Sequence, residues 1–410
     1  MKNKKWNTID LFAGCGGLTE GFEQSGYFES LACVEWEQAP ASNLKNRLQT
    51  KWKYNNVNEK VMVFDIQRTD ELIYGWNDER YKHHKGLKEL CSEKSVDVII
   101  GGPPCQAYSM AGRVNKANNM DADYRNYLFE SYLKVVDYFK PKVFVFENVE
   151  GMLSATPGGT PVINLITDGF KKIGYEITSD LKNIALLNLA DYGVPQNRKR
   201  VIIIGINRTE FEGNHQDILK DFYINILSNY KVNSKMTVGN ALDDLPKLYP
   251  LKEEVKIGRK KYSHTFENIN IANHEPRYHN KRDIGIFKDI AYDLFKGEEK
   301  YVSAEALKEL YTERTGKTGN IHKYHVLRPD SPSNTITAHL SKDGLRHIHP
   351  DYNQARSITV REAARLQSFP DDYEFISSTG ANYKMIGNAV PPKFARLLAN
   401  AINEFINKYI

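Results

Sequence analysis

The apolar residues divide the chain into two parts. Up to about residue 206, short, mainly apolar segments alternate with amphipathic segments, whereas from there to about residue 324 the apolar residues are sparse and irregular. Short, mainly apolar segments predict strands buried on both faces, and the amphipathic segments predict helices covering a parallel sheet. Strands are expected at 6–12, 30–35, 61–65, 96–100, 143–146 and 200–206, and helices at 19–24, 39–47, 127–139 and 163–173.

This alternation indicates the α/β class with a doubly wound, mostly parallel sheet. Regular patterns return near the C-terminus, where Thr359 followed by Glu362 has the spacing of a capping box and predicts a helix over 359–367. A closing helix is expected over 394–409. We therefore expect a first domain built from both ends of the chain, with a smaller, irregular domain inserted between them.

Length and composition narrow the class of protein. The chain has 410 residues, enough for two domains, and is 41% hydrophobic and 26% charged, as is usual for a soluble globular protein. It contains no apolar run long enough for a membrane helix and no secretory signal pattern. All four cysteines lie within the first 105 residues. These features predict a cytoplasmic protein with free thiols and no membrane partner.

The net charge of +5 has a local origin. The segment 255–282 contains seven basic and two acidic residues, so everything outside it sums to zero. Aromatic residues and histidines are interleaved with the charges. The segment is either a solvated loop or a nucleic-acid face, with Arg259, Lys260, Lys261 and Arg277 as candidate DNA contacts. Its histidines lack the spacing of paired metal ligands, so we expect no metal site and place them on the surface or against phosphates.

Candidate binding chemistry begins in a glycine-rich loop at 10–17, directly after the first expected strand. Such a loop lets the backbone approach a ligand closely. Residue 19 is threonine, so the full glycine pattern of nicotinamide enzymes is absent. Glu35 and Trp36 end the second strand and Asp65 the third, where they suit the ribose hydroxyls, the purine face and the adenine amino group. The set favours S-adenosyl-L-methionine over NAD.

Candidate reaction chemistry lies at the ends of two later strands. Two prolines stiffen the loop before Cys105 at the carboxyl edge of the sheet, a position that favours a nucleophile over a small buried thiol. Glu147 ends the next strand, where it is either a general acid or a helix cap. Arg198 and Arg200 enter a strand two positions apart and therefore share a face.

These blocks together resemble the bacterial DNA (cytosine-5)-methyltransferases. In chain order the resemblance rests on DLFAGCGG, Glu35-Trp36, Asp65-Ile66, GGPPCQAYS, ENVEGM, QNRKR, REAARLQSFPDDYEF and GNAVPP. The matching blocks cover most of 8–206 and 357–410, while 207–325 has no matching motif. The resemblance implies an S-adenosylmethionine-dependent methyltransferase fold. Its catalytic and cofactor-binding domain would be 1–206 completed by 376–410, and its target-recognition domain 207–375, with the variable part at about 207–325.

The resemblance also implies roles for single residues. Cys105 would add to carbon 6 of a flipped-out cytosine, and Glu147 would protonate ring nitrogen 3. Arg198 would contact the base or its phosphate, with Arg200 beside Glu147. A polar loop at 109–126, with Ser109 and Arg113, would close over the DNA. The cofactor contacts would be Phe12, Gly14, Gly16, Leu18, Glu35, Trp36, Asp65, Ile66, Gly102, Pro104, Leu128 and Asn388.

Three alternatives are weaker. A tRNA cytosine-5 methyltransferase of the related branch carries a cysteine in its recognition region, and no cysteine follows Cys105 here. A non-enzymatic DNA-binding relative would be expected to lack Cys105, Glu147 or the glycine loop, and a nicotinamide dehydrogenase lacks a Pro-Pro-Cys loop. We expect a monomer that acts on duplex DNA containing a specific short sequence. A cognate restriction endonuclease acting on the same site is the further partner that the resemblance suggests.

Overall fold

The structure is a computed structural model that describes residues 5–104, 128–156, 159–267, 270–318 and 323–410. The chain forms two compact units. The first comprises Met1–Gly193, Arg198–Asn233 and Ala389–Ile410, and the second Val194–Asn197 and Ser234–Asn388. Among the helices described, none combines the length and the apolar character needed to cross a membrane. The functional roles assigned from the sequence to two domains stay predictions.

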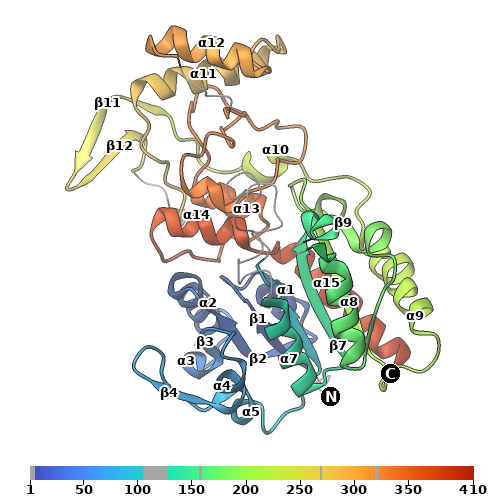
Figure 1. Ribbon diagram of the computed structural model, residues 1–410. Coiled ribbons are helices and arrows are strands. Elements are labelled where there is room, and N and C mark those ends of the chain that lie inside the picture. The colour runs from blue at the N-terminus through green and yellow to red at the C-terminus, as the bar shows by residue number, and fades with distance from the viewer. Residues whose placement is uncertain (1–4, 105–127, 157–158, 268–269, 319–322) are drawn as a thin grey trace. The chain divides into compact units, whose positions relative to one another are not determined.

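The first unit is built on one mostly parallel sheet, which confirms the expected fold class (Figure 1). The strand order is β3-β2-β1-β6-β7-β10-β8, with β9 paired to β10. Pairing is parallel from β3 to β7, and β10 runs antiparallel to its neighbours. The carboxyl ends of five strands and the start of β10 therefore share one edge of the sheet. The bounds are β1 Trp6–Leu11, β2 Phe28–Glu35, β3 Val61–Val63, β6 Val98–Gly101, β7 Val143–Val149, β8 Tyr175–Ile177, β9 Leu186–Asn188 and β10 Lys199–Asn207.

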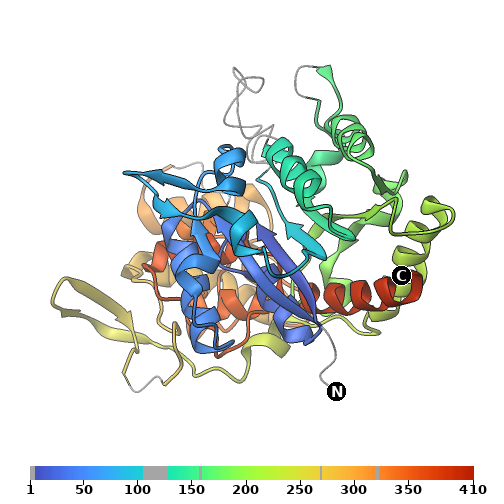
Figure 2. The ribbon, with the colours of Figure 1, turned by 90° about the horizontal axis from the view of Figure 1, so that it is seen from below.

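Helices cover the sheet, with α7 on one side and α15 on the other (Figure 2). The C-terminal helix α15 packs on α1, and a methyl group at Gly21 would collide with Ala395. The end of the chain thus completes the first unit. Its helices are α1 Gly17–Ser25, α2 Gln38–Thr50, α3 Val57–Lys60, α4 Thr69–Tyr74, α5 Gly86–Leu90, α7 Leu128–Phe139, α8 Val162–Lys172, α9 His215–Asp221 and α15 Pro392–Tyr409. Shorter elements are the hairpin β4 Trp76–Asp78 and β5 Lys82–His84, and η2 Glu150–Ser154, η4 Leu181–Ala185, η5 Leu189–Tyr192, η6 Phe222–Ile226 and η7 Leu227–Tyr230.

The second unit is more regular than the sequence suggested. Two helices, α11 Lys281–Lys296 and α12 Ala304–Thr315, lie in the region expected to be irregular. Side chains of Asn280 and Ser303 cap them, and both helices contribute to a small apolar core. The expectation was wrong because charged residues interrupt the apolar positions of these helices. The other elements are α10 Val238–Leu242, β11 Pro250–Ile257, β12 Lys260–His264, η8 Ala338–Ser341, α13 Val360–Leu366 and α14 Thr379–Asn388.

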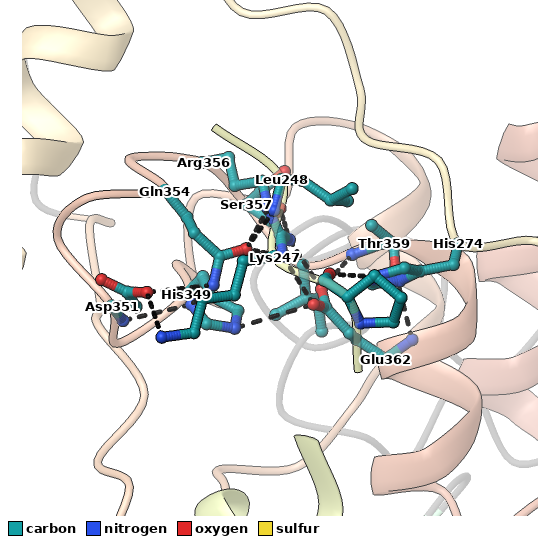
Figure 3. A network of polar contacts seen from close by, with 12 residues as sticks. Lys247, Leu248, His274, His349, Asp351, Gln354, Arg356, Ser357, Thr359 and Glu362 are labelled. Carbon is teal, nitrogen blue, oxygen red and sulfur yellow. Dashed lines mark hydrogen bonds and ion pairs between the residues drawn. The ribbon is translucent and has the colours of Figure 1, made fainter. Parts of the chain in front are cut away.

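A buried polar network organises the second unit (Figure 3). The capping box predicted at Thr359 is confirmed, since Thr359 accepts from the Glu362 amide and Glu362 accepts from the Thr359 amide at 2.7 Å. The Glu362 carboxylate is also bound by the buried Arg356 guanidinium at 2.6 and 2.7 Å. Burial raises the pKa of this carboxyl, but the charge and hydrogen bonds of Arg356 outweigh it and hold the pKa well below its usual range.

The histidines of 255–282 belong to this interior, which corrects our expectation that they lie on the surface. His264, His274 and His279 are all buried. His274 Nδ1 lies 3.0 Å from the Thr359 hydroxyl, and His264 Nε2 lies 2.9 Å from the carbonyl of Gln354. Burial lowers the pKa of His264 to about 4. These side chains are therefore neutral structural groups and add no positive charge to the surface at neutral pH.

Candidate active site

The glycine-rich loop leaves β1 in an unusual backbone conformation. Phe12 has φ +61°, which is rare for a residue with a side chain, and Gly14 and Gly16 follow with φ +57° and +81°. A methyl group on Gly16 would collide with Leu44, whereas one on Gly14 would meet nothing within 4 Å. The loop is therefore tight against α2 at Gly16 and open on the side of Gly14, as a ligand-binding loop must be.

Glu35 holds this loop against the end of β2. Its Oε2 accepts from the Gly14 amide at 2.8 Å, and its Oε1 accepts from the Glu37 amide at 2.7 Å. Burial raises the pKa of Glu35, and these two amide donors oppose that shift. The next side chain, Trp36, is 46% exposed. Asp65 follows β3, and its Oδ1 accepts from the Gln67 amide at 3.0 Å.

Three predicted cofactor residues serve the core of the first unit. Leu18, Ile66 and Leu128 are all buried. Any cofactor contact they make stays a prediction. Asn388 ends α14 and belongs to the second unit, so its assignment also stays a prediction.

Asp10 is a residue of this site for which we predicted no role from the sequence. Its carboxyl group is buried, and Oδ2 accepts from the Thr19 hydroxyl at 2.5 Å. Among the described residues, no donor reaches Oδ1. Burial raises the pKa of Asp10 to about 7. The signal was present in the sequence, because a charged residue at the end of an apolar strand and a threonine in place of the third glycine are both unusual.

Glu147 and Arg200 form an ion pair at the same edge of the sheet. Arg200 Nε lies 2.8 Å from Glu147 Oε1, and both side chains are about seven-eighths buried. Their strands pair antiparallel, with Ile202 opposite Glu147, which brings Arg200 alongside the end of β7. The partially buried pair fixes the direction of the Glu147 carboxylate.

The loop after β6 presses against Glu147. A methyl group on Gly102 would lie 2.7 Å from Glu147 Oε2. The Asn148 side-chain amide donates to the carbonyl of Pro103 at 3.3 Å, which ties the loop to β7. The structure thus brings Gly102, Pro104 and Glu147 together at adjacent strand ends. Cys105, Ser109 and Arg113 lie outside the described residues.

Arg198 immediately precedes β10, and its side chain is fully buried. Its Nη2 donates to the carbonyl of Ala389 at 3.1 Å. Burial lowers the pKa of Arg198 well below its usual value, the Arg200 charge adds to that shift, and Glu147 opposes it. The structure pairs Arg200 with Glu147, as the resemblance implied, whereas the chemical roles of Arg198, Arg200 and Glu147 stay predictions.

The candidate DNA residues of the second unit differ in their surroundings. Lys260 is paired with Glu275, and Lys261 with Glu254 at 2.9 Å. Arg277 donates to the carbonyls of Leu340 and Ser341 and lies over the Tyr383 ring at 4.1 Å from its centroid. Arg259 is exposed in the turn between β11 and β12. No cluster of three or more potential metal ligands occurs within the described segments.

Residues 6–404 match the family of C-5 cytosine-specific DNA methylases. Among curated proteins, the type II methyltransferase M.Bpa9945I of Bacillus paralicheniformis is 34% identical over 97% of this chain and 99% of its own length. The type II methyltransferase M.DdeI of Desulfomicrobium norvegicum is 33% identical over 97% of this chain and 88% of its own.

Solved structures share the fold. A protein assigned as a prophage-encoded DNA modification methyltransferase of E. coli has a TM-score of 0.62 and 23% identity over 98% of this chain and all of that one. The S. pombe Dnmt2 methyltransferase has a TM-score of 0.54 and 14% identity, and the match covers 98% of this chain and 99% of that chain. The match across nearly the whole chain and the relatives at a third identity place this protein in the C-5 cytosine-specific DNA methylase family, as a DNA (cytosine-5)-methyltransferase.

Proposed function

We propose that this enzyme transfers a methyl group from S-adenosyl-L-methionine to carbon 5 of one cytosine within a specific duplex DNA sequence, through a covalent bond between Cys105 and carbon 6. The proposal rests on one observation: a loop suited to a cofactor and a carboxylate suited to a base lie at the same edge of the sheet. An open glycine loop is held by Glu35, and an ion-paired Glu147 stands beside the loop that leads to Cys105.

The residues around the glycine loop fit an adenosine-containing cofactor. The side of Gly14 is open, and Trp36 offers an exposed indole face on which a purine can stack. Glu35 accepts one amide at each carboxylate oxygen, which leaves further acceptor positions for the two ribose hydroxyls. Asp65 supplies a second carboxylate after the adjacent strand. When bound here, S-adenosylmethionine supplies an activated methyl group on a positively charged sulfur.

The carboxyl group of Glu147 is positioned to serve the cytosine. Addition of a thiolate to carbon 6 drives negative charge onto ring nitrogen 3, and a proton or hydrogen bond at that atom relieves it. Arg200 fixes one oxygen of Glu147, at 2.8 Å, and the close approach of Gly102 to the other oxygen limits its movement. Glu147 therefore has a defined direction in which to meet a base.

Cys105 is proposed as the nucleophile, and it follows Gly102 by three positions in the sequence. Its bond to carbon 6 makes carbon 5 electron-rich, and loss of the carbon-5 proton after methylation allows the thiolate to leave. The base must first leave the duplex, because stacking covers the carbon-6 face. The buried Arg198 guanidinium would contact the base or its phosphate.

Membership of a restriction–modification system is a further part of the proposal. The two relatives named above are type II methyltransferases and match along nearly the whole chain. A modification enzyme of this kind protects a short sequence that a cognate restriction endonuclease cleaves. The DNA substrate and the endonuclease are accordingly the proposed partners, and the enzyme is proposed to act as a cytoplasmic monomer.

The direct test uses methyl-labelled S-adenosylmethionine with duplex DNA or with tRNA. We expect label in the DNA alone, and base-resolution mapping should place it at carbon 5 of cytosine within one short sequence. Binding of S-adenosylmethionine by the free enzyme, measured by calorimetry, tests the cofactor independently of turnover. Label in tRNA without label in DNA would refute the proposal.

A further inference from the structure

The strands β11 and β12 form a two-stranded ribbon in the second unit. Gly258 and Arg259 join them in a two-residue turn, with Gly258 at φ +59°. Residues 252–261 are all exposed, and both views show the ribbon extending away from the helices of its own unit (Figures 1 and 2). Arg259 therefore occupies the tip of a projecting ribbon.

The base of the ribbon is firmly anchored. His264, the last residue of β12, is fully buried and bonded to the carbonyl of Gln354 at 2.9 Å. The Tyr262 and Phe266 rings stack at 4.0 Å between centroids, and the Tyr278 hydroxyl donates to Glu254 at 2.6 Å. A ribbon fixed at its base presents its tip in a defined direction, which reduces the entropy lost when the tip binds a partner.

The charges near the tip are not equivalent. Lys260 and Lys261 are each paired with a glutamate. Arg259 and Lys256, in contrast, make no ion pair or hydrogen bond with any part of the chain that the structure describes. The uncompensated positive charge at this end of the ribbon therefore comes from Lys256 and Arg259.

The two faces of the ribbon also differ. Cross-strand partners share a face, and the register pairs Val255 with Tyr262 and Ile257 with Lys260. One face thus carries two exposed β-branched side chains, with Val255 at 39% and Ile257 at 54% exposure. The same face carries Lys260, the cross-strand partner of Ile257. Two exposed apolar side chains beside an unpaired arginine suit a partner that offers methyl groups, hydrogen-bond acceptors and negative charge together.

We infer that the β11–β12 ribbon enters the major groove of the substrate DNA and that Arg259 determines sequence preference by contacting a guanine. The major groove admits a two-stranded ribbon, exposes the thymine methyl group to apolar contact, and presents the two guanine acceptors that arginine binds with both of its arms. The phosphates on either side attract the uncompensated charge at the tip. The inference rests on the proposed DNA substrate, and it names Arg259 as a residue that recognises the sequence of that DNA.

The test compares the wild type with Arg259→Ala and Arg259→Lys on a pool of duplexes with randomised bases. Sequencing of methylated cytosines gives the preference at each position around the target. We expect Arg259→Ala to lose about 10- to 100-fold discrimination at one position where the wild type requires G·C, with other positions unchanged. Arg259→Lys keeps the charge but not the planar fork, so its loss should be intermediate.

Arg80→Ala is the matched control, because Arg80 is also exposed between the strands of a hairpin, β4–β5; its preferences should equal those of the wild type. Thermal melting confirms that each variant is folded. Unchanged preferences in a methylating Arg259→Ala enzyme would overturn the inference and leave the proposed function standing. A uniform loss on all sequences would also overturn it, since that marks a phosphate contact. A wild type that methylates no DNA would overturn both.

Discussion

Replacing Gly102 with alanine tests whether the position of Glu147 governs turnover. The new methyl group would lie 2.7 Å from Glu147 Oε2, whereas ordinary contact begins at 3.4 Å, so the carboxylate or the loop must move by about 0.7 Å. The carboxylate cannot swing away freely, because Arg200 holds its other oxygen at 2.8 Å. A displacement approaching 1 Å at a reacting group costs up to about 100-fold in rate.

We therefore expect Gly102→Ala to lower kcat about 10- to 100-fold with saturating DNA and cofactor. The free energy of unfolding should fall by only about 1–3 kcal/mol, which is typical of one extra methyl group in a packed site. Single-turnover methylation with labelled cofactor measures the rate, and thermal melting measures stability. Calorimetry with S-adenosylmethionine measures cofactor affinity separately, because Gly102 is itself a predicted cofactor contact and kcat is measured at saturating cofactor.

Two further variants isolate the cause. Gly285→Ala is the control: Gly285 lies within α11, and a methyl group there meets nothing within 4 Å. This variant should gain up to about 1 kcal/mol of stability without a change in turnover. In a Glu147→Gln background, Gly102→Ala should add little further loss if it acts through Glu147. Wild-type turnover in Gly102→Ala, or full additivity with Glu147→Gln, would refute the reasoning.

Three other predictions address single groups. Glu147→Gln should lower kcat about 10²- to 10⁴-fold, because an amide cannot protonate the base, while gel-shift affinity for DNA is retained; undiminished turnover would contradict this. Trp36→Ala should weaken S-adenosylmethionine binding about tenfold by calorimetry, because a stacking face is lost, whereas the exposed Tyr27→Ala should not. Asp10→Asn should become more stable relative to wild type as pH rises from 5 to 7, by about 2 kcal/mol. A folded-state pKa raised to about 7 makes the wild type lose stability as the carboxyl ionises, and a constant difference in unfolding midpoints would show otherwise.

The order of strands and helices along the first unit could be predicted because each element is marked by residues close together in the sequence. Apolar runs ending in glycine or a carboxylate located β1, β2, β6 and β7, and the residues at their ends share one edge in the structure. Glu35 and Glu147 were found for this reason. Their contacts were not predictable, because Gly14 donates to a residue 21 positions away and Arg200 is brought to Glu147 by an antiparallel strand.

The second unit shows where sequence reasoning failed. The net charge of 255–282 gives every basic residue the same weight. In the structure, Lys260 and Lys261 are paired with glutamates, and Arg277 donates to the backbone carbonyl of Ser341. The buried histidines were taken for surface groups because their partners are distant in sequence, as with His264 and Gln354, 90 positions apart. Helix α11 could have been found from Asn280 and the spacing of Ile286 and Ile290.

The covalent step is the centre of this account, and a 5-fluorocytosine duplex tests it directly. Fluorine at carbon 5 blocks the release of the enzyme, so a Cys105–carbon 6 bond should persist through denaturing electrophoresis. With S-adenosylmethionine present, we predict a stoichiometric protein–DNA adduct whose mass fits one methylated strand and whose linked peptide contains Cys105. Cys105→Ser should form none. Absence of an adduct with the wild type, or its persistence in Cys105→Ser, would contradict the proposed mechanism.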